Sequence, residues 1–138
     1  MKDYNVDAIT IDFKVTKAKI QISDLVEGNN VFSLIECHVN NIKIKTKDFH
    51  LYNAFLELRK KLESNGIFLL CKGCLVNVHP SGRQLISTKA NELTIGKRVD
   101  RDKVVDIFDP IKNLGEFFSI RNQKDFYDYW LISIKGVD

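Results

Sequence analysis

Apolar and polar residues alternate along the first part of the chain. The apolar members of this alternation are Ile9, Ile11, Phe13 and Val15. A period of two is typical of a strand with one buried face. The next apolar residues, Ala18, Ile20 and Ile22, fall on even positions. Because a shift of one residue moves side chains to the other face, the pattern predicts a bulge or turn at Thr16 and Lys17.

Two further strands are predicted after a turn at residues 27–30, whose composition is Glu-Gly-Asn-Asn. They cover residues 31–39 and 42–45, on either side of Asn40 and Asn41. Asparagine tolerates positive φ better than most residues. The pair therefore predicts a two-residue hairpin turn.

The clearest helix is predicted over residues 48–65, with Asp48 as its N-cap and Gly66 as its stop. Its apolar stripe consists of Leu51, Phe55, Leu58 and Leu62. A second helix is predicted over residues 123–135, with Asn122 as its N-cap. Its broad apolar face consists of Phe126, Tyr127, Trp130, Leu131 and Ile134. Stripes of this spacing indicate helices that cover a sheet.

Residues 67–71 and 74–78 are apolar runs on either side of Lys72 and Gly73, and they predict a second tight hairpin. Further short strands are expected over residues 85–88, 92–95 and 103–108. Hairpins combined with two helices that do not alternate with them indicate an α+β fold. We expect a mostly antiparallel sheet packed against two helices in a single domain, residues 1–138.

Composition limits the classes of protein to which this chain can belong. The chain has 138 residues and a formal charge of +3, and 44% of its residues are apolar. It starts without the apolar run of a secretion signal, and no stretch approaches the ~18 apolar residues of a membrane span. Its three cysteines do not form a disulfide framework. We therefore expect a cytoplasmic protein that does not contact a membrane.

Few residues are candidates for catalysis or for binding a cofactor or metal ion. No Walker loop or dinucleotide glycine motif is present, so neither a cofactor nor a small-molecule substrate is predicted. Cys71 and Cys74 have the spacing of a zinc knuckle, and His79 is the nearest further ligand. His79, Ser81 and Asp106 could be named as a nucleophilic triad. A small enzyme or zinc protein built on this region is therefore an alternative to a binding protein, although we predict neither metal ligands nor catalytic residues.

Two surfaces are candidates for binding a partner. The loop after the expected hairpin contains His79, Ser81 and Arg83, and loops of this kind often carry function. The second surface is the solvent side of the last helix, at Asp128 and Tyr129. Tyrosine supplies a large, rigid contact area and is enriched at binding hot spots.

Nucleic-acid binding is a further alternative. Phe117 and Phe118 could stack on bases. Lysine and arginine residues are, however, spread along the chain and interrupted by acids. A nucleic-acid-binding domain is usually more strongly basic, so this alternative ranks below protein binding.

The region from residue 66 to residue 110 carries a resemblance. Its motifs are LCKG at 70–73, NVHPSG at 77–82, LTIGK at 93–97 and VDIFD at 105–109. It resembles small uncharacterised bacterial proteins that are similar to immunity proteins of polymorphic toxin and contact-dependent growth inhibition systems. This resemblance implies a non-enzymatic protein that neutralises a cognate toxin by direct binding. Because the chain is mildly basic, we expect a partner that is acidic or neutral at the contact, or that is bound away from any nucleic-acid site.

Overall fold

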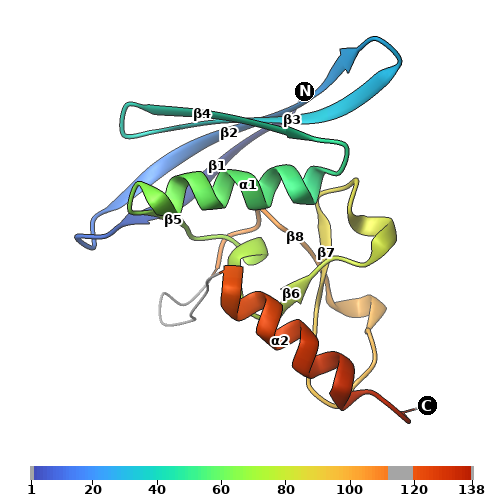
Figure 1. Ribbon diagram of the computed structural model, residues 1–138. Coiled ribbons are helices and arrows are strands. Elements are labelled where there is room, and N and C mark those ends of the chain that lie inside the picture. Colours follow the sequence, from blue (N-terminus) through green and yellow to red (C-terminus); the bar gives the residue numbers. More distant parts are fainter. Residues whose placement is uncertain (1, 112–119, 138) are drawn as a thin grey trace.

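The computed structural model describes residues 2–111 and 120–137, and the predicted α+β class is confirmed (Figure 1). The larger antiparallel sheet has the order β4-β3-β2-β1-β5. Its strands are β1 (Lys2–Thr10), β2 (Val15–Glu27), β3 (Asn30–Val39), β4 (Ile42–Asp48) and β5 (Ile67–Leu69). A smaller antiparallel sheet has the order β6-β7-β8. Its strands are β6 (Val78–His79), β7 (Lys89–Glu92) and β8 (Val104–Asp106).

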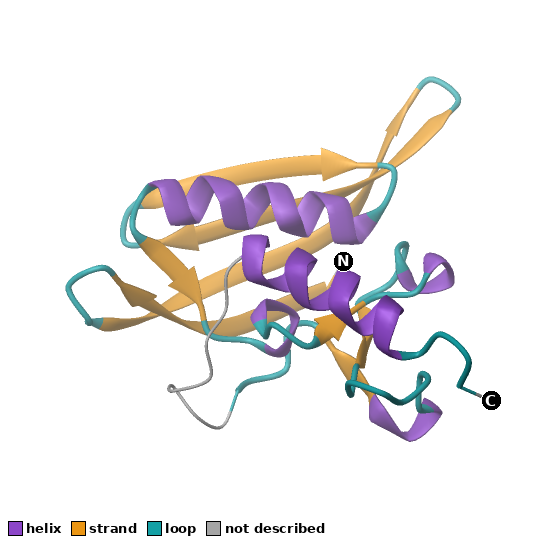
Figure 2. Cartoon of the chain, turned by 60° about the horizontal axis from the view of Figure 1, so that its bottom comes forward, coloured by secondary structure: helices purple, strands orange, loops and turns teal. Residues whose placement is uncertain are grey.

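Helix α1 (Leu51–Ser64) lies against one face of the larger sheet, and α2 (Ile120–Ser133) lies beside the smaller sheet (Figure 2). Three short 3-10 turns complete the described structure: η1 (Lys72–Cys74), η2 (Gly82–Gln84) and η3 (Arg101–Lys103). Among the described residues, no helix combines the length and apolar character needed to cross a membrane.

The hydrophobic core lies between the larger sheet and α1. The sheet contributes buried residues from alternating positions, among them Val6, Ala8, Ala18, Ile20, Ile35 and Cys37. The apolar stripe of α1 that the sequence predicts is confirmed, because Leu51, Phe55, Leu58 and Leu62 are all buried. Phe108 contacts both Tyr4 of β1 and Phe55 of α1, and together with Ile107 it extends the core toward the smaller sheet.

The turn predicted at Asn40 and Asn41 is confirmed. Their φ angles are 47° and 66°, both in the left-handed region. Two consecutive residues with positive φ match the twist of the flanking strands, which is why this turn favours asparagine. The turn places His38 directly opposite Lys43 in the β3–β4 ladder.

The continuous strand expected over residues 9–15 is wrong, because the chain reverses between Thr10 and Lys14. The Thr10 amide donates to the Lys14 carbonyl at 2.9 Å, and the Phe13 amide donates to the Thr10 carbonyl at 2.9 Å. Phe13 adopts a φ of 64° and is 83% exposed at the tip of the β1–β2 hairpin. This earlier reversal also explains the change of apolar phase that suggested a bulge at residues 16–17.

Helix α1 begins three residues later than expected and does not use Asp48 as its N-cap. Asp48 ends β4, and its Oδ1 accepts a hydrogen bond from the His50 amide at 2.9 Å. His50 occupies the N-cap position instead. Asp48 therefore shapes the loop before the helix. The stop at Gly66 is confirmed by its φ of 73°.

Helix α2 covers Ile120–Ser133 rather than 123–135, so Asn122 lies inside the helix and is not its N-cap. The expected apolar face is only partly confirmed. Trp130 is buried, but Leu131 is 40% exposed. Gln123, a polar residue that the apolar pattern left out, is 3% exposed and faces the interior.

The tight hairpin expected over residues 67–78 is wrong. β5 pairs with β1, and Lys72–Cys74 form the η1 turn. The Gly73 amide donates to the Ile107 carbonyl at 2.8 Å, and a Cβ on Gly73 would lie 2.7 Å from the Cβ of Ile107. Contacts with a segment distant in sequence therefore set this conformation, which local spacing could not reveal.

The strands expected over residues 85–88 and 92–95 are also wrong, because the strand at this place is β7, which shares only Glu92 with the second range. A turn that follows η2, in which the Ser87 amide donates to the Gln84 carbonyl at 2.9 Å, occupies the first range. The strand expected over residues 103–108 is confirmed in its centre as β8.

We expect Leu58→Ala to lower the free energy of unfolding by about 2–5 kcal/mol, because it would open a cavity in a core that repacks poorly. Leu58 is 0% exposed. Urea unfolding monitored by circular dichroism measures the change. The matched control is Lys60→Ala on the exposed side of the same helix, with an expected effect within about 0.5 kcal/mol. Equal losses in both variants would contradict this description of α1.

Candidate functional site

The structure brings together the two surfaces nominated from the sequence. The imidazole of His79, at the end of β6, stacks on Tyr127 of α2 with ring centroids 4.0 Å apart and planes inclined by 19°. Tyr52 of α1 lies on another side, with a centroid distance of 6.0 Å. His79 Nδ1 lies 3.1 Å from the Pro80 carbonyl, so the neutral ring donates from Nδ1. Its Nε2 is then the acceptor nitrogen.

Burial shifts the titration of this histidine. Desolvation lowers the pKa of His79 below its ordinary value, and the Pro80 carbonyl and the charge of Asp128 oppose the shift only in part. His79 is therefore a neutral, half-buried aromatic residue at neutral pH, and it helps hold α2 against β6.

The loop after His79 is held by hydrogen bonds of the backbone and of the Gln84 side chain. The Ser81 amide donates to Gln84 Oε1 at 2.8 Å, and the Gln84 amide donates to the Ser81 carbonyl at 3.0 Å. Gln84 Nε2 also donates to Asn91 Oδ1 on β7 at 3.0 Å, which ties the loop to the smaller sheet. Ser81 and Arg83 are exposed, so both are available to a partner.

The proposed triad is not assembled in the described hydrogen bonds. Asp106, on β8, accepts from Thr88 Oγ1 at 2.8 Å and lies 3.7 Å from Lys89 Nζ. His79 is on β6, and β7 separates the two strands. The described hydrogen bonds of Ser81 go to Gln84, and Nδ1 of His79 bonds to the Pro80 carbonyl. The arrangement lacks the serine–histidine–carboxylate chain that nucleophilic catalysis requires.

Asp128 and Tyr129 lie on the solvent side of α2, as the sequence predicts. Tyr129 is 63% exposed, and Ile132, one turn further along, is 64% exposed. With Asp125 and Asp128 these two residues occupy the spacing i, i+3, i+4, i+7, which places them on one side of the helix. We call Asp125, Asp128, Tyr129 and Ile132 the α2 outer stripe.

Cys71 and Cys74 lie in contact beneath α2. Their Sγ atoms are 3.6 Å apart, and the two residues are 0% and 1% exposed. Among the residues that the structure describes, no group of three histidine, cysteine or acidic side chains could hold a metal ion. Two sulfur ligands alone do not complete a tetrahedral zinc site. The described residues therefore do not bring His79 or another such ligand to the two cysteines.

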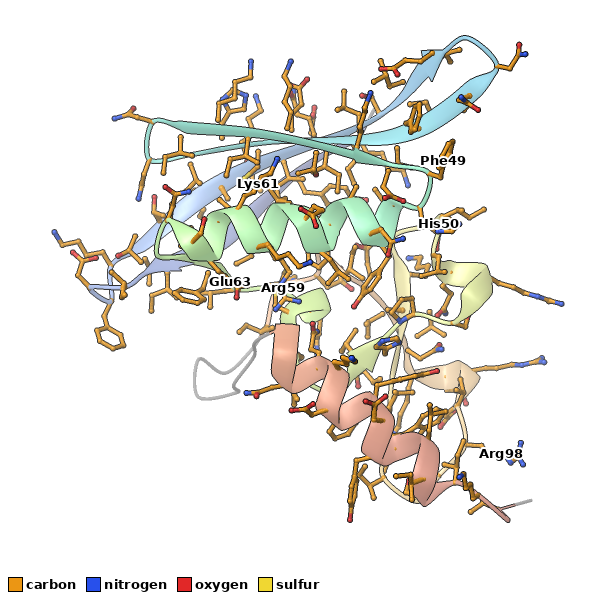
Figure 3. The ribbon with its side chains drawn as sticks, viewed as in Figure 1. Phe49, His50, Arg59, Lys61, Glu63 and Arg98 are labelled. Carbon is orange, nitrogen blue, oxygen red and sulfur yellow. The ribbon has the colours of Figure 1, made fainter. Side chains whose placement is uncertain are left out.

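The most unusual buried group is Arg59 of α1, which the sequence offers as an ordinary surface charge. It is 1% exposed and points from α1 toward η1 and the start of α2 (Figure 3). Its Nη1 donates to Gln123 Oε1, and its Nε lies 3.4 Å from Glu63 Oε2. Nε and Nη2 have no hydrogen-bond partner within the described part of the chain. A buried cation needs compensation, so Arg59 is a strong constraint on its neighbours.

Gln123 connects this cation to the η1 turn. Its Nε2 donates to the carbonyls of Gly73 and Leu75, at 2.7 Å each. One buried amide therefore joins α1, α2 and the turn that carries Cys74. A glutamine near the aromatic residues of the last helix is the sequence signal that could have pointed to this cluster. If such a side chain is buried, its amide almost always has hydrogen-bond partners.

The environment separates the pKa values of the two thiols. Burial alone would raise the pKa of Cys74, but a hydrogen bond from Cys71 and the charge of Arg59 outweigh it, so the pKa of Cys74 lies below its ordinary value. Donation of that hydrogen bond, together with burial, raises the pKa of Cys71 well above its ordinary value. Of the two sulfurs, Cys74 therefore favours the thiolate, the nucleophilic form.

A third feature, which the sequence interpretation missed, is a basic row on the face of the larger sheet opposite α1. Lys19, His38 and Lys43 are cross-strand partners on β2, β3 and β4. His38 therefore lies between the two lysines in this row. Within the described residues, neither Lys19 nor Lys43 has a carboxylate within ion-pair distance, whereas Lys17 pairs with Asp7.

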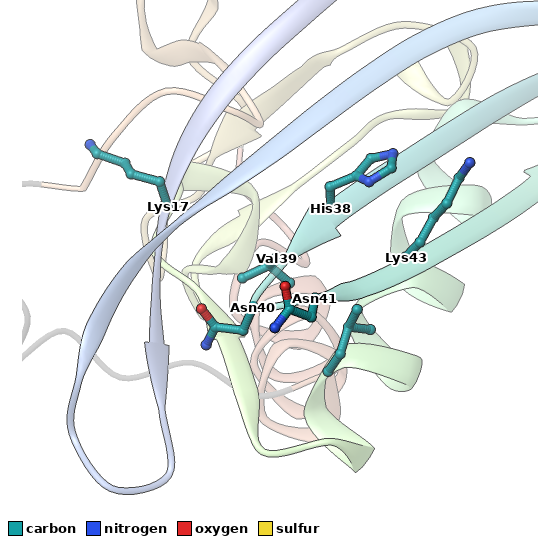
Figure 4. Close-up of a pocket in the computed structure, with 7 residues that line it drawn as sticks. Lys17, His38, Val39, Asn40, Asn41 and Lys43 are labelled. Carbon is teal, nitrogen blue, oxygen red and sulfur yellow. The ribbon is translucent and has the colours of Figure 1, made fainter.

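This row borders a surface hollow of about 310 Å³ (Figure 4). His38 and Lys43 line it together with Lys17 and the Asn40–Asn41 turn. No acidic side chain is among the lining residues. The register that follows from a two-residue turn could have predicted the pairing of His38 with Lys43. Phe117 and Phe118, the other nucleic-acid candidates, lie outside the described residues.

The chain matches no protein-family model, and no curated protein matches its sequence.

We expect the stability of the protein to fall as the pH decreases from about 7 to about 5, in part through His79. Its folded pKa is below its unfolded value, so its contribution is present above the unfolded pKa and is lost as the pH falls through the folded pKa. His79→Phe keeps a ring against Tyr127 but cannot titrate. Urea unfolding at both pH values should show a smaller loss in this variant than in the wild type. Equal losses would show that His79 does not contribute.

Proposed function

We propose that this protein is a non-enzymatic binding protein whose contact surface combines the α2 outer stripe with the neighbouring loop at His79, Ser81 and Arg83. The observation that carries the proposal is the exposure of Tyr129 and Ile132, 63% and 64%, on a helix whose opposite side is docked by Gln123 and Trp130. A rigid helix that presents an aromatic and an aliphatic side chain to solvent suits helix-in-groove or flat-surface recognition.

The stacking of His79 on Tyr127 makes the two parts one surface. The loop is held by Ser81 and Gln84, so its exposed Arg83 projects from an ordered support. Preorganisation of this kind lowers the entropy cost of association. The arrangement therefore favours a binding role over a catalytic one for His79 and Ser81.

The partner that we propose is a folded bacterial toxin domain, as the resemblance of residues 66–110 to immunity proteins suggests. Although the chain as a whole carries +3, the α2 outer stripe carries two carboxylates, Asp125 and Asp128, beside Tyr129. Charge complementarity then favours a toxin surface with an apolar centre and basic side chains at its rim. This local charge refines the expectation drawn from the overall charge alone.

We expect Tyr129→Ala and Ile132→Asp each to weaken a complex with the protein encoded by the adjacent open reading frame by at least about tenfold, which is 1.4 kcal/mol. Co-expression followed by calorimetric titration of the purified proteins measures the affinity. The matched control is Val26→Asp, because Val26 is 66% exposed at the distant β2–β3 hairpin.

Two results would contradict the proposal. In one, the neighbouring protein is harmless when produced alone and forms no complex. In the other, Val26→Asp weakens the complex as much as Ile132→Asp, which would place the contact elsewhere or show a general loss of folding.

The basic row favours a second candidate function, the binding of a polyanion such as a nucleic acid on the open face of the sheet. Lys19 and Lys43 lack carboxylate partners among the described residues, and together with His38 they form a line across three strands. Phosphate groups could pair with the two ammonium groups of this row.

For this candidate we expect the double variant Lys19→Ala, Lys43→Ala to elute from heparin at lower salt than the wild type and to show a reduced salt dependence of oligonucleotide binding. The control, Lys60→Ala with Lys61→Ala on the exposed side of α1, removes the same charge. If the wild type is not retained at low salt, or if both double variants shift equally, the basic row is not a polyanion site.

A further inference from the structure

We propose that Cys71 and Cys74 form a reversible intramolecular disulfide, and that its formation weakens the docking of α2 on α1 and η1. This modification site is independent of the identity of the binding partner.

The η1 turn already holds the two thiols against each other. Cys71 and Cys74 lie at the two ends of η1, where the Cys74 amide donates to the Cys71 carbonyl at 2.9 Å. Their Sγ atoms are 3.6 Å apart. A disulfide needs about 2.05 Å between the sulfurs and a Cα spacing that a tight turn provides. Side-chain rotation can therefore close the gap without a change of fold.

The third cysteine is excluded from this chemistry by its position. Cys37 lies on β3, in the sheet side of the core, and burial raises its pKa to about 11. Cys74, in contrast, receives a hydrogen bond from Cys71 and lies in the field of the Arg59 cation. The structure thus provides one favoured nucleophilic sulfur and one resolving sulfur, side by side.

The reaction balances with a small disulfide as the oxidant, of which glutathione disulfide is the probe. The Cys74 thiolate attacks one sulfur of glutathione disulfide, and one glutathione thiolate leaves. Cys71 loses its proton and attacks Cys74 Sγ in the mixed disulfide, which expels the second glutathione. Two protein thiols are oxidised, glutathione disulfide is reduced by two electrons, and the two protons end on the two glutathione thiols.

Both sulfurs are buried, so the reaction requires local opening of the segment above them. That segment is held by Gln123, which bonds to the carbonyls of Gly73 and Leu75 and to Arg59. Opening of η1 and the docking of α2 are therefore linked, because Gln123 bonds to the carbonyls on both sides of Cys74.

Oxidation also changes the electrostatics of the cluster. The reduced pair can place negative charge on Cys74 near the Arg59 guanidinium, whereas a disulfide carries no charge. Arg59 would then keep Glu63 and Gln123 as its charged and polar neighbours, and Nε and Nη2 have no hydrogen-bond partner among the described residues. A less compensated buried cation raises the free energy of the closed arrangement. Contacts that Arg59 makes with α2 should loosen as a result.

The experiment equilibrates the purified full chain with glutathione mixtures from fully reducing to fully oxidising. It then quenches with an alkylating agent under denaturing conditions and measures the intact mass. Three alkylated cysteines are expected in the reduced protein, and one, Cys37, in the oxidised protein, which should also lack two hydrogens. Cys37→Ser should retain the transition, while Cys71→Ser and Cys74→Ser should abolish it.

The single tryptophan, Trp130, lies on α2, where its Nε1 donates to the Lys97 carbonyl at 2.9 Å. Its fluorescence emission should shift to longer wavelength on oxidation of the wild type and of Cys37→Ser, but not of Cys74→Ser. Three alkylatable thiols at every glutathione ratio, or glutathione adducts without an internal bond, would overturn the disulfide. A disulfide that forms with no change in Trp130 emission would overturn the coupling to α2.

Discussion

A cation buried between two helices constrains the architecture of this protein more than any other single group. The sheet side of α1 is apolar, and its burial resembles that of any helix packed on a sheet. The flank of this buried stripe carries Arg59, whose charge has to be compensated without water. Gln123 provides part of that compensation and at the same time holds the carbonyls of Gly73 and Leu75. Polar groups as well as apolar contacts therefore fix how α2, η1 and α1 meet.

This arrangement explains which parts of the fold could be predicted from the sequence. The Asn40–Asn41 turn and the apolar stripe of α1 depend on neighbours within a few residues, and both are confirmed. The η1 turn depends on Ile107, more than thirty residues away, and the local pattern gave a hairpin instead. At Thr10 and Phe13 the prediction was wrong for a local reason. A regular alternation suggested a strand, and local hydrogen bonds closed a turn within it.

The candidate site residues also divide into those that nearby sequence could reveal and those that depend on the tertiary structure. His79, Ser81, Arg83, Asp128 and Tyr129 could be chosen by residue type and expected exposure, although nothing in the sequence showed that His79 stacks on α2. Arg59 could not be chosen, because a lysine- and arginine-rich stretch of an amphipathic helix normally faces solvent. Its burial is a property of the tertiary structure. The Lys19–His38–Lys43 row lies between these cases, since it follows from strand register once the turns are known.

The position of β4 has a consequence for how copies of this protein meet in a concentrated solution. β4 is the outermost strand of the larger sheet, and the opposite edge, β5, has only three residues. An outer strand of seven residues could pair with the same strand of another molecule. Lys43, Lys45 and Lys47 alternate along it on the open face, and Lys45 and Lys47 pair with Glu36 and Glu27. Pairing of two such strands would bring the charged side chains of both copies together. Charged side chains along an outer strand of this kind disfavour its pairing with the same strand of another molecule.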